Sequence, residues 1–218
     1  MYRFVSPLLA LAIAAGSAVA ADMVPLTTEL PKPMFVGTPK PVNLPNLEKP
    51  TQGAKPPFMV PAGTTNLALE RPVTSSDDFP VIGELEYITD GDKNGGDGYF
   101  VELGPDTQWV QIDLGKTSKI HAVMLWHYHL AARAYHDVIV QVADDEAFTK
   151  NVRTVFNNDH DNSSGLGAGR DPAYIETYEG RLIPVAGLDA RYVRFYSRGN
   201  TSDGMNHYVE IEVFGQQS

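Results

Sequence analysis

The sequence contains no cysteine. Anchoring through a lipid-modified N-terminal cysteine and stabilisation by disulfide bonds are therefore both excluded. The fold has to be stabilised by a hydrophobic core, to which a bound metal could add.

Basic residues are also scarce, because 17 Lys and Arg stand against 27 Asp and Glu and give a formal net charge of −10. This balance argues against nucleic acid and against anionic membrane surfaces as partners, since both are contacted through Lys and Arg. It favours neutral ligands, cations or basic partners. The alternative is that the acidic residues only keep the protein soluble.

The motifs of common catalysts are missing as well. The sequence has no Gly-x-Ser-x-Gly elbow, no His-Glu-x-x-His and no phosphate-binding loop. Catalysis needs a nucleophile beside a base, or carboxylates set apart in a cleft. His160, between Asp159 and Asp161, could imitate an acid-base group, but polar binding loops commonly have this composition. We therefore expect a protein that is not an enzyme.

Long apolar runs are absent except at the start of the chain. Arg3 precedes an apolar run over residues 4–15 that is too short to span a bilayer, and Ala18-Val19-Ala20 fits a signal peptidase site. We expect residues 1–20 to be a signal peptide. The protein is then exported, to the periplasm, the cell envelope or the medium, and no later segment is expected to span a membrane.

Proline is dense in the next segment, with ten prolines between residues 24 and 61. Such density excludes helix and central strand, so residues 21–62 are predicted to form an extended, semi-rigid arm that could act as a spacer. The apolar clusters Met34-Phe35-Val36 and Phe58-Met59-Val60 do not suit a solvated linker. They indicate docking, either on the chain's own domain or on a protein assembly that residues 24–61 would contact.

Residues 63–218 have the pattern of a single all-β domain, with short apolar runs separated by Gly, Asn and Asp. Residues 109–114 alternate, whereas residues 119–128 are more continuously apolar, as in a strand buried on both faces. Further strands are predicted at residues 137–142, 153–156, 174–177, 192–196 and 208–214.

Five motifs occur in order along this domain. They are Asn66-Leu67-Ala68-Leu69 with residues 72–76, Ile88-Thr89-Asp90-Gly91-Asp92, residues 109–115, residues 190–194 and residues 210–215. In order and spacing they resemble discoidin domains, also called coagulation factor C-type or galactose-binding-like domains. The resemblance implies a jelly-roll β-sandwich whose first and last strands lie side by side, so that the arm leaves near the C-terminus. The Gly-rich segment 94–99 and the polar loop 157–165 depart from a minimal member, and they leave the ligand open.

The segment from Asp90 to Gly95 places oxygen ligands at alternate positions, with glycines that let the chain curl around a hard cation. It is not an EF-hand, because position twelve is Val101. The resemblance implies a structural calcium site. The expected ligands are the carbonyl of Ile88, the carboxylates of Asp90 and Asp92 and, from the last strand, Glu210. The alternative is an Asp-Gly turn without metal.

The candidate ligand-binding residues follow the strand that ends at Trp126-His127-Tyr128-His129. An aromatic plane beside Arg, His and Asn donors is typical of sugar sites, because the ring stacks on the sugar and the donors bond its hydroxyls. We expect a glycan or polysaccharide ligand. The predicted set is His129, Arg133, Tyr135, Asn158, Asp159 and Asn206.

Other interpretations of the same residues stay open. His127 and His129 could bind zinc or copper together with His160. Asp159 and Asp161, with Ser163, could enclose a second calcium or cap a turn.

Trp126 is expected in the core rather than on the ligand face. The leading function is an exported, non-catalytic carbohydrate-binding protein. The alternatives are a structural or accessory subunit of an envelope or extracellular assembly, joined through its arm, and a metal-dependent enzyme that uses the histidines.

Overall fold

The computed structural model describes residues 22–35, 40–49, 53 and 55–217. The expected signal peptide and Val36 of the first apolar cluster lie outside the described residues. The elements in chain order are β1 (Met23–Pro25), β2 (Met59–Pro61), β3 (Thr65–Asn66), β4 (Val73–Ser75), the short 3₁₀ helix η1 (Leu85–Thr89), β5 (Val101–Leu103), β6 (Gln108–Trp126), β7 (Ile139–Ala143), β8 (Arg153–Asn157), β9 (Arg181–Ser197), β10 (Asn206–Tyr208) and β11 (Glu210–Gln217). The described chain has no helix long and apolar enough to cross a bilayer.

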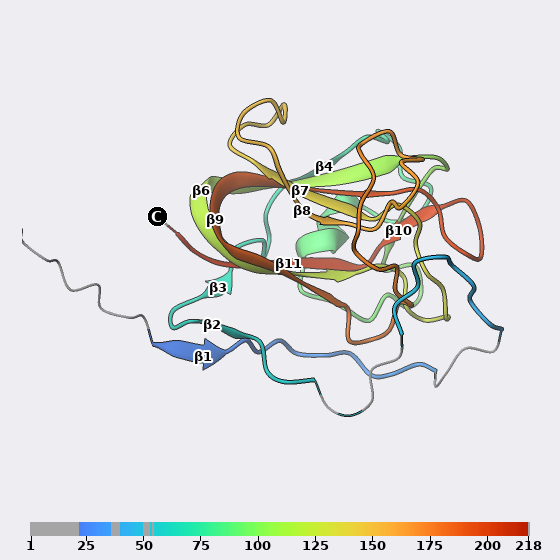
Figure 1. Ribbon diagram of the computed structural model, residues 1–218, viewed down its shortest axis with the longest axis horizontal. Helices are drawn as coiled ribbons and strands as arrows, with labels where there is room; N and C mark the ends of the chain where they lie inside the picture. Colours follow the sequence, from blue (N-terminus) through green and yellow to red (C-terminus); the bar gives the residue numbers. More distant parts are fainter. Residues whose placement is uncertain (1–21, 36–39, 50–52, 54, 218) are drawn as a thin grey trace, which may run out of the picture.

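The domain is a sandwich of antiparallel strands, which confirms the predicted all-β fold. The strand order β3-β11-β6-β9-β7-β8, with β4 paired to β6, describes a sheet that folds over on itself. β6 and β9 are long enough to run through both layers, and their ladder shifts register between Asp113 and Ser118. Gly115, with φ of +84°, lies in this bend, where a residue with a side chain would be strained. Figure 1 shows the two strands curving from one layer into the other.

The first and last strands of the domain pair as the resemblance implied. β11 lies against β3, with Phe214 opposite Asn66 and Gly215 opposite Thr65. The amide of Gln216 also donates to the carbonyl of Ala62 at 2.8 Å. The arm therefore joins the sandwich beside the end of β11.

The apolar run in β6 is buried on both faces, but different groups pack against each face. Val123 and Leu125 point into the core between the layers, whereas Met124 and Trp126 belong to a second apolar cluster on the outside of the sheet. Leu26 and Phe58 of the arm pack on that outer cluster. The prediction of a doubly buried strand is therefore confirmed, and Trp126 is fully buried as expected.

The described arm packs on the chain's own domain. β1 and β2 form a small antiparallel ribbon, with Val24 opposite Val60, and Thr28 donates to the carboxylate of Glu212 at 2.7 Å. Figure 1 shows the blue arm running along the lower side of the sandwich. For Phe58-Met59-Val60, the structure thus shows docking on the domain.

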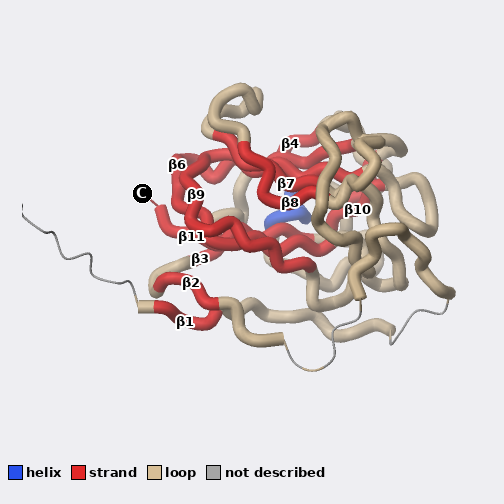
Figure 2. Tube along the Cα trace, viewed as in Figure 1, coloured by secondary structure: helices blue, strands red, loops and turns tan. Residues whose placement is uncertain are grey.

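One predicted strand is wrong. Residues 174–177 form a loop, because Ala173 bonds to the arm and Glu176 donates its N–H to the carbonyl of Arg133 instead of to a sheet neighbour. The strand predicted at residues 109–114 and most of the one predicted at residues 119–128 are parts of the single strand β6, which ends at Trp126. The strand predicted at residues 208–214 is divided at Val209, which lies between β10 and β11. Figure 2 shows most loops gathered at the end of the sandwich opposite the bend.

Candidate ligand-binding site

Glu210, at the start of β11, reaches the segment from Asp90 to Gly95 as predicted, and we call this segment the Asp90 turn. Its Oε2 accepts a hydrogen bond from the Gly91 N–H at 3.1 Å. Its other oxygen is buried and has no hydrogen-bond partner within the described residues. Burial raises the pKa of Glu210 to about 9, although the Gly91 bond and Lys93 act in the opposite direction. An unpaired buried carboxylate oxygen at this turn fits a cation ligand, because a cation would compensate the cost of burying it.

The other expected calcium ligands lie around the same turn. Burial raises the pKa of Asp90, and the carboxylate of Asp90 adds to the raised pKa of Glu210. Asp92 is exposed, and its Oδ1 accepts the backbone N–H and the side-chain amide of Asn94. Ile88 is fully buried in η1. In the described chain, Asp90, Asp92 and Glu210 do not bring their carboxylate oxygens together as a group of three within 4.8 Å. The unpaired oxygen of Glu210 suits a hard cation, and the roles of Asp90, Asp92 and the Ile88 carbonyl stay predictions.

Lys93 is a feature of this turn that the sequence did not reveal. Its side chain is 9% exposed and its Nζ lies 2.8 Å from Oε1 of Glu212. The ammonium also lies 5.4 Å from the ring centroid of Trp126. A lysine that follows an Asp-Gly-Asp segment ordinarily points into solvent, so this burial depends on the arrangement of β6 and β11 around it.

The two strand histidines are both buried, but they contact different groups. His127 Nδ1 lies 2.6 Å from Glu176 Oε1, and both side chains are fully buried. His129 Nε2 lies 2.7 Å from the carbonyl oxygen of Lys93. In the described part of the chain, no group of three or more potential metal ligands includes a histidine. This arrangement gives no support to a zinc or copper site formed with His160.

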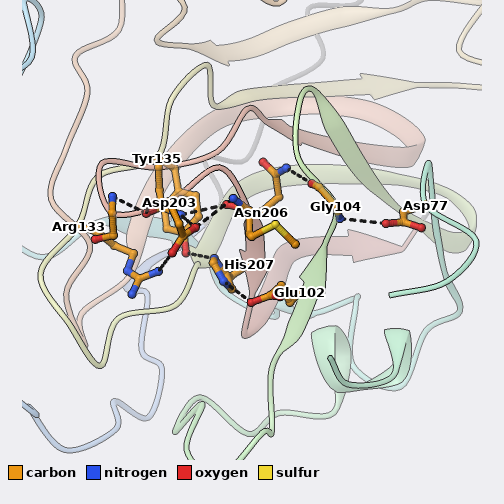
Figure 3. A network of polar contacts seen from close by, with 11 residues as sticks. Asp77, Glu102, Gly104, Arg133, Tyr135, Asp203, Asn206 and His207 are labelled. Atoms are coloured by element: carbon orange, nitrogen blue, oxygen red, sulfur yellow. Dashed lines mark hydrogen bonds and ion pairs between the residues drawn. The ribbon is translucent and has the colours of Figure 1, made fainter. Parts of the chain in front are cut away.

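A polar network connects the loops at this end of the sandwich (Figure 3). The Tyr135 hydroxyl lies 2.9 Å from His207 Nδ1, and His207 Nε2 lies 2.9 Å from Glu102 Oε2. Burial raises the pKa of Tyr135 well above its usual value, so the hydroxyl keeps its proton and donates. Burial also lowers the pKa of His207. A neutral His207 accepts from Tyr135 at Nδ1 and donates to Glu102 from Nε2.

Arg133 and Asn206 stabilise the same loops. The Arg133 guanidinium lies 4.8 Å from the ring centroid of Tyr128 and 3.4 Å from the carboxylate of Asp203. The side chain of Asn206 is fully buried. Its oxygen accepts from Ser197 and Gly199, and its nitrogen donates to the carbonyls of Gly104 and Asp106. Asn206 therefore makes the four hydrogen bonds that an amide side chain can form.

A cavity of about 290 Å³ opens beside this network, and we call it the loop cavity. It is lined mainly by polar side chains. They include Tyr135, His136, Asn158, His160, Asp161 and Arg198. The loops around it are paired, since the His136 N–H donates to the carbonyl of Gly199 and the Arg198 N–H to the carbonyl of His136. Their side chains can therefore be held in fixed positions around a ligand.

Three carboxylates meet at the rim of the loop cavity. Oxygens of Asp137, Asp159 and Asp161 lie within 4.8 Å of one another. Asp159 accepts the N–H groups of Ser163 and Ser164 and the Ser164 hydroxyl, which is the pattern of a capped turn. Burial, together with the neighbouring carboxylates, raises the pKa of Asp137. Of the two interpretations open for this loop, the hydrogen bonds favour the turn.

The six predicted ligand-binding residues are thus only partly brought together. Tyr135 and Asn158 line the loop cavity. Asp159 and Asn206 use their polar groups within the loops, Arg133 lies in the network and His129 is bonded to Lys93. Their roles toward a ligand stay predictions.

Sequence reasoning missed Arg198, Asp137 and the buried Glu176. A lone arginine after a strand and single acids in loops give no pattern that would identify them. The sequence also gave no sign that the arm contributes Leu44 and Asn46 to the cavity lining.

Comparisons with known proteins agree with this architecture. A family model described as F5/F8 type C, NedA-like, galactose-binding domain matches residues 87–195, which is half of the chain. No curated protein matches the sequence.

Solved structures share the fold. Chitosan-binding module 1 from a chitosanase/glucanase of Paenibacillus sp. IK-5, in a selenomethionine-labelled mutant form, is 22% identical with a TM-score of 0.50, and the match covers 69% of this chain and 98% of the module. A family 89 glycoside hydrolase from Clostridium perfringens, in complex with its substrate GlcNAc-α-1,4-galactose, is 16% identical with a TM-score of 0.52. That match covers 70% of this chain and 15% of the hydrolase.

Proposed function

The chain belongs to the F5/F8 type C family of NedA-like, galactose-binding domains, and on this basis we propose that it is a non-catalytic carbohydrate-binding protein whose sugar site is the loop cavity. The observation that supports this most directly is the cavity itself, about 290 Å³ in volume and lined by donors and acceptors from paired loops. Ligand sites of proteins usually measure roughly 300–1,000 Å³, so this cavity suits one sugar residue or a short segment of a chain.

The chemistry of the lining matches the needs of a sugar. Hydroxyl groups both donate and accept, and the cavity offers the guanidinium of Arg198, the imidazoles of His136 and His160 and the carboxylate of Asp161. Asp159 is saturated with hydrogen bonds from its own loop, which suits a supporting role better than acid-base catalysis. A module of the same fold that binds chitosan makes amino sugars a first choice of probe.

Arg198→Ala tests this site. The Arg198 side chain is exposed and the bond from its backbone N–H to the His136 carbonyl is unaffected by the change, so the variant should fold normally. Losing a charged hydrogen bond to a hydroxyl is expected to weaken sugar binding about tenfold or more. The measurement is a glycan array, followed by calorimetry with chitosan tetrasaccharide, GlcNAc-α-1,4-galactose and galactose.

The matched control is Arg170→Ala, which removes the same charge from an exposed residue of the neighbouring loop that does not line the cavity. Equal affinities for the wild type, R198A and R170A would place the sugar elsewhere. An array on which the wild type binds no glycan would overturn the proposed function.

The proposal includes a structural calcium ion at the Asp90 turn, with Glu210 and Asp90 as ligands and Asp92 and the Ile88 carbonyl as further candidates. The unpaired, buried oxygen of Glu210 supports it. Calcium binds oxygen ligands, and an ion at this turn would join a long loop to β11.

The proposal also includes export of the protein, supported by Arg3, the apolar run that follows it and Ala18-Val19-Ala20. We expect the mature protein to begin near Ala21. N-terminal sequencing of protein from fractionated cells checks this, and an intact N-terminus on cytoplasmic protein would contradict it.

A subunit role in a protein assembly is the second candidate. The observation in its favour is that the docked arm still exposes large apolar side chains. These are Met23, Val24, Leu30, Met34 and Met59, with exposures between 40% and 61%. Met23, Val24 and Met59 lie together on the β1–β2 ribbon, and exposed apolar residues that lie together are typical of protein contacts. Co-purification with the wild type and with Met34→Ser would detect such a partner.

A further inference from the structure

One wall of the loop cavity does not come from the sandwich. Leu44 and Asn46 line it together with Tyr135, Asn158 and Ala173. Both arm residues precede β3, the first strand of the domain, and both lie outside the segment matched by the family model, residues 87–195. Figure 1 shows this part of the arm beside the loops at the right-hand end of the sandwich.

The arm is fixed at this place by backbone pairing. Leu47 forms a parallel bridge with Ala173. The N–H of Glu48 donates to the Ala173 carbonyl at 2.8 Å, and the Ala173 N–H donates to the Asn46 carbonyl at 3.0 Å. Because Ala173 itself lines the cavity, the arm and the cavity wall are joined at the same residue.

Side chains strengthen this attachment. The amide nitrogen of Asn46 donates to the carbonyl of Asn158 at 2.8 Å, and Asn158 also lines the cavity. Glu48 pairs with Arg181 at 2.7 Å. The arm is therefore bonded to two cavity residues, Asn158 and Ala173, which lie at separate points of the long loop between β8 and β9.

Asn46 and Leu44 offer groups that a sugar can use. Within the described residues, no donor is bonded to the amide oxygen of Asn46, so this oxygen can accept from a ligand hydroxyl. Leu44 is half-buried and presents an apolar surface to the same cavity, which suits the C–H face of a sugar ring.

We infer that the arm is part of the binding site, with Asn46 and Leu44 as specificity-determining residues and the Leu47–Glu48 pairing as their support. This inference rests on the proposed function of the loop cavity. It follows that the sandwich without residues 44–48 has an incomplete site, and that sugars are selected by the arm as well as by the loops.

Point variants in the full chain test the inference. Asn46→Ala and Leu44→Ala are each expected to weaken binding of the best array glycan at least fivefold, and to change the order of affinities among chitosan tetrasaccharide, GlcNAc-α-1,4-galactose and galactose. The matched control is Lys55→Ala. It removes a different contact between arm and domain, the exposed pair with Glu179, and neither residue lines the cavity.

Hydrogen exchange at the Ala173 amide separates direct contact from loss of docking. If affinity falls while exchange at the Ala173 amide is unchanged, the substituted residue contacts the sugar directly. If affinity falls and this amide exchanges faster, the arm has come away from the cavity. Both results support the inference. If R198A loses binding while N46A and L44A bind within twofold of wild type with the same preferences, the inference is wrong and the proposed function stands. If the wild type binds no glycan, the inference and the proposed function are both wrong.

Discussion

Glu176→Ala is expected to lower the free energy of unfolding by about 3 kcal/mol, because it leaves His127 without its partner in a fully buried position. The pair is 2.6 Å apart, and His127 stacks on Tyr135 with ring centroids 4.2 Å apart. Loss of the carboxylate therefore leaves Nδ1 of His127 without a hydrogen-bond partner. It also leaves a void beside the ring that supports Tyr135, which lines the loop cavity. Chemical denaturation followed by circular dichroism measures the change.

Two further variants show whether the effect comes from this hydrogen bond. Glu176→Gln keeps an oxygen that can accept from His127 and should lose less than half as much stability. Glu179→Ala removes an exposed carboxylate from the same loop, where its pair with Lys55 is largely solvated, and should change stability by less than about 0.5 kcal/mol. If E176A proves as stable as E179A, the buried pair has no structural importance.

Glu210→Gln is expected to stabilise the metal-free protein at neutral pH, and at the same time to abolish any response to calcium. In the folded protein the pKa of Glu210 is about 9, against 4.5 as its ordinary value. Between these values the folded state holds a proton that the unfolded state has released. The stabilisation is therefore complete below about pH 4.5 and is lost as pH rises toward 9.

Glutamine imitates the protonated carboxyl and does not titrate. In chelator, E210Q should exceed the wild type by roughly 3 kcal/mol at pH 7, since 2.5 pH units separate pH 7 from the ordinary pKa. The difference should vanish near pH 4.5. Thermal or chemical unfolding across this pH range measures it.

Adding calcium should reduce the lead of E210Q over the wild type. A divalent ion favours the ionised carboxylate, so the wild type should gain several degrees in Tm at millimolar calcium, whereas E210Q should gain little. Glu146→Gln, the same chemical change at an exposed position, should respond like the wild type. Identical calcium responses of wild type and E210Q would exclude Glu210 as a ligand.

The fold could be predicted well because its signals are local. The alternation in residues 109–114 and the closing motif at residues 210–215 each depend on a few adjacent residues, and both lie in paired strands. The approach of Glu210 to the Asp90 turn followed from the implied order of the strands. The loop at residues 174–177 was mistaken for a strand because Tyr174, Ile175 and Thr177 are residue types that are enriched in strands. The bond from the Glu176 N–H to the Arg133 carbonyl is long-range and leaves no local signal.

The candidate site could be predicted only in part, because a sequence shows which residues are polar but not which polar groups are already bonded. Asn206 and Asp159 were sensible choices by composition, yet loop N–H and carbonyl groups occupy their side chains. Arg198 and Asn46 come from segments about 150 residues apart, and only the folded chain shows that they share a cavity. Long-range placement of this kind leaves no trace in the local pattern.

The position of Trp126 gives the molecule a built-in optical reporter. Its indole is fully buried, donates to the Tyr178 carbonyl at 3.0 Å, lies near the Lys93 ammonium and belongs to the cluster on which Leu26 and Phe58 of the arm pack. The arm and the Asp90 turn therefore meet at one chromophore. Detachment of the arm would admit water to this indole and shift its emission to longer wavelength, whereas movement of Lys93 would change its quenching. In a variant that lacks Trp109, the second tryptophan of the chain, the emission of Trp126 would thus follow both the arm and the Asp90 turn without an added label.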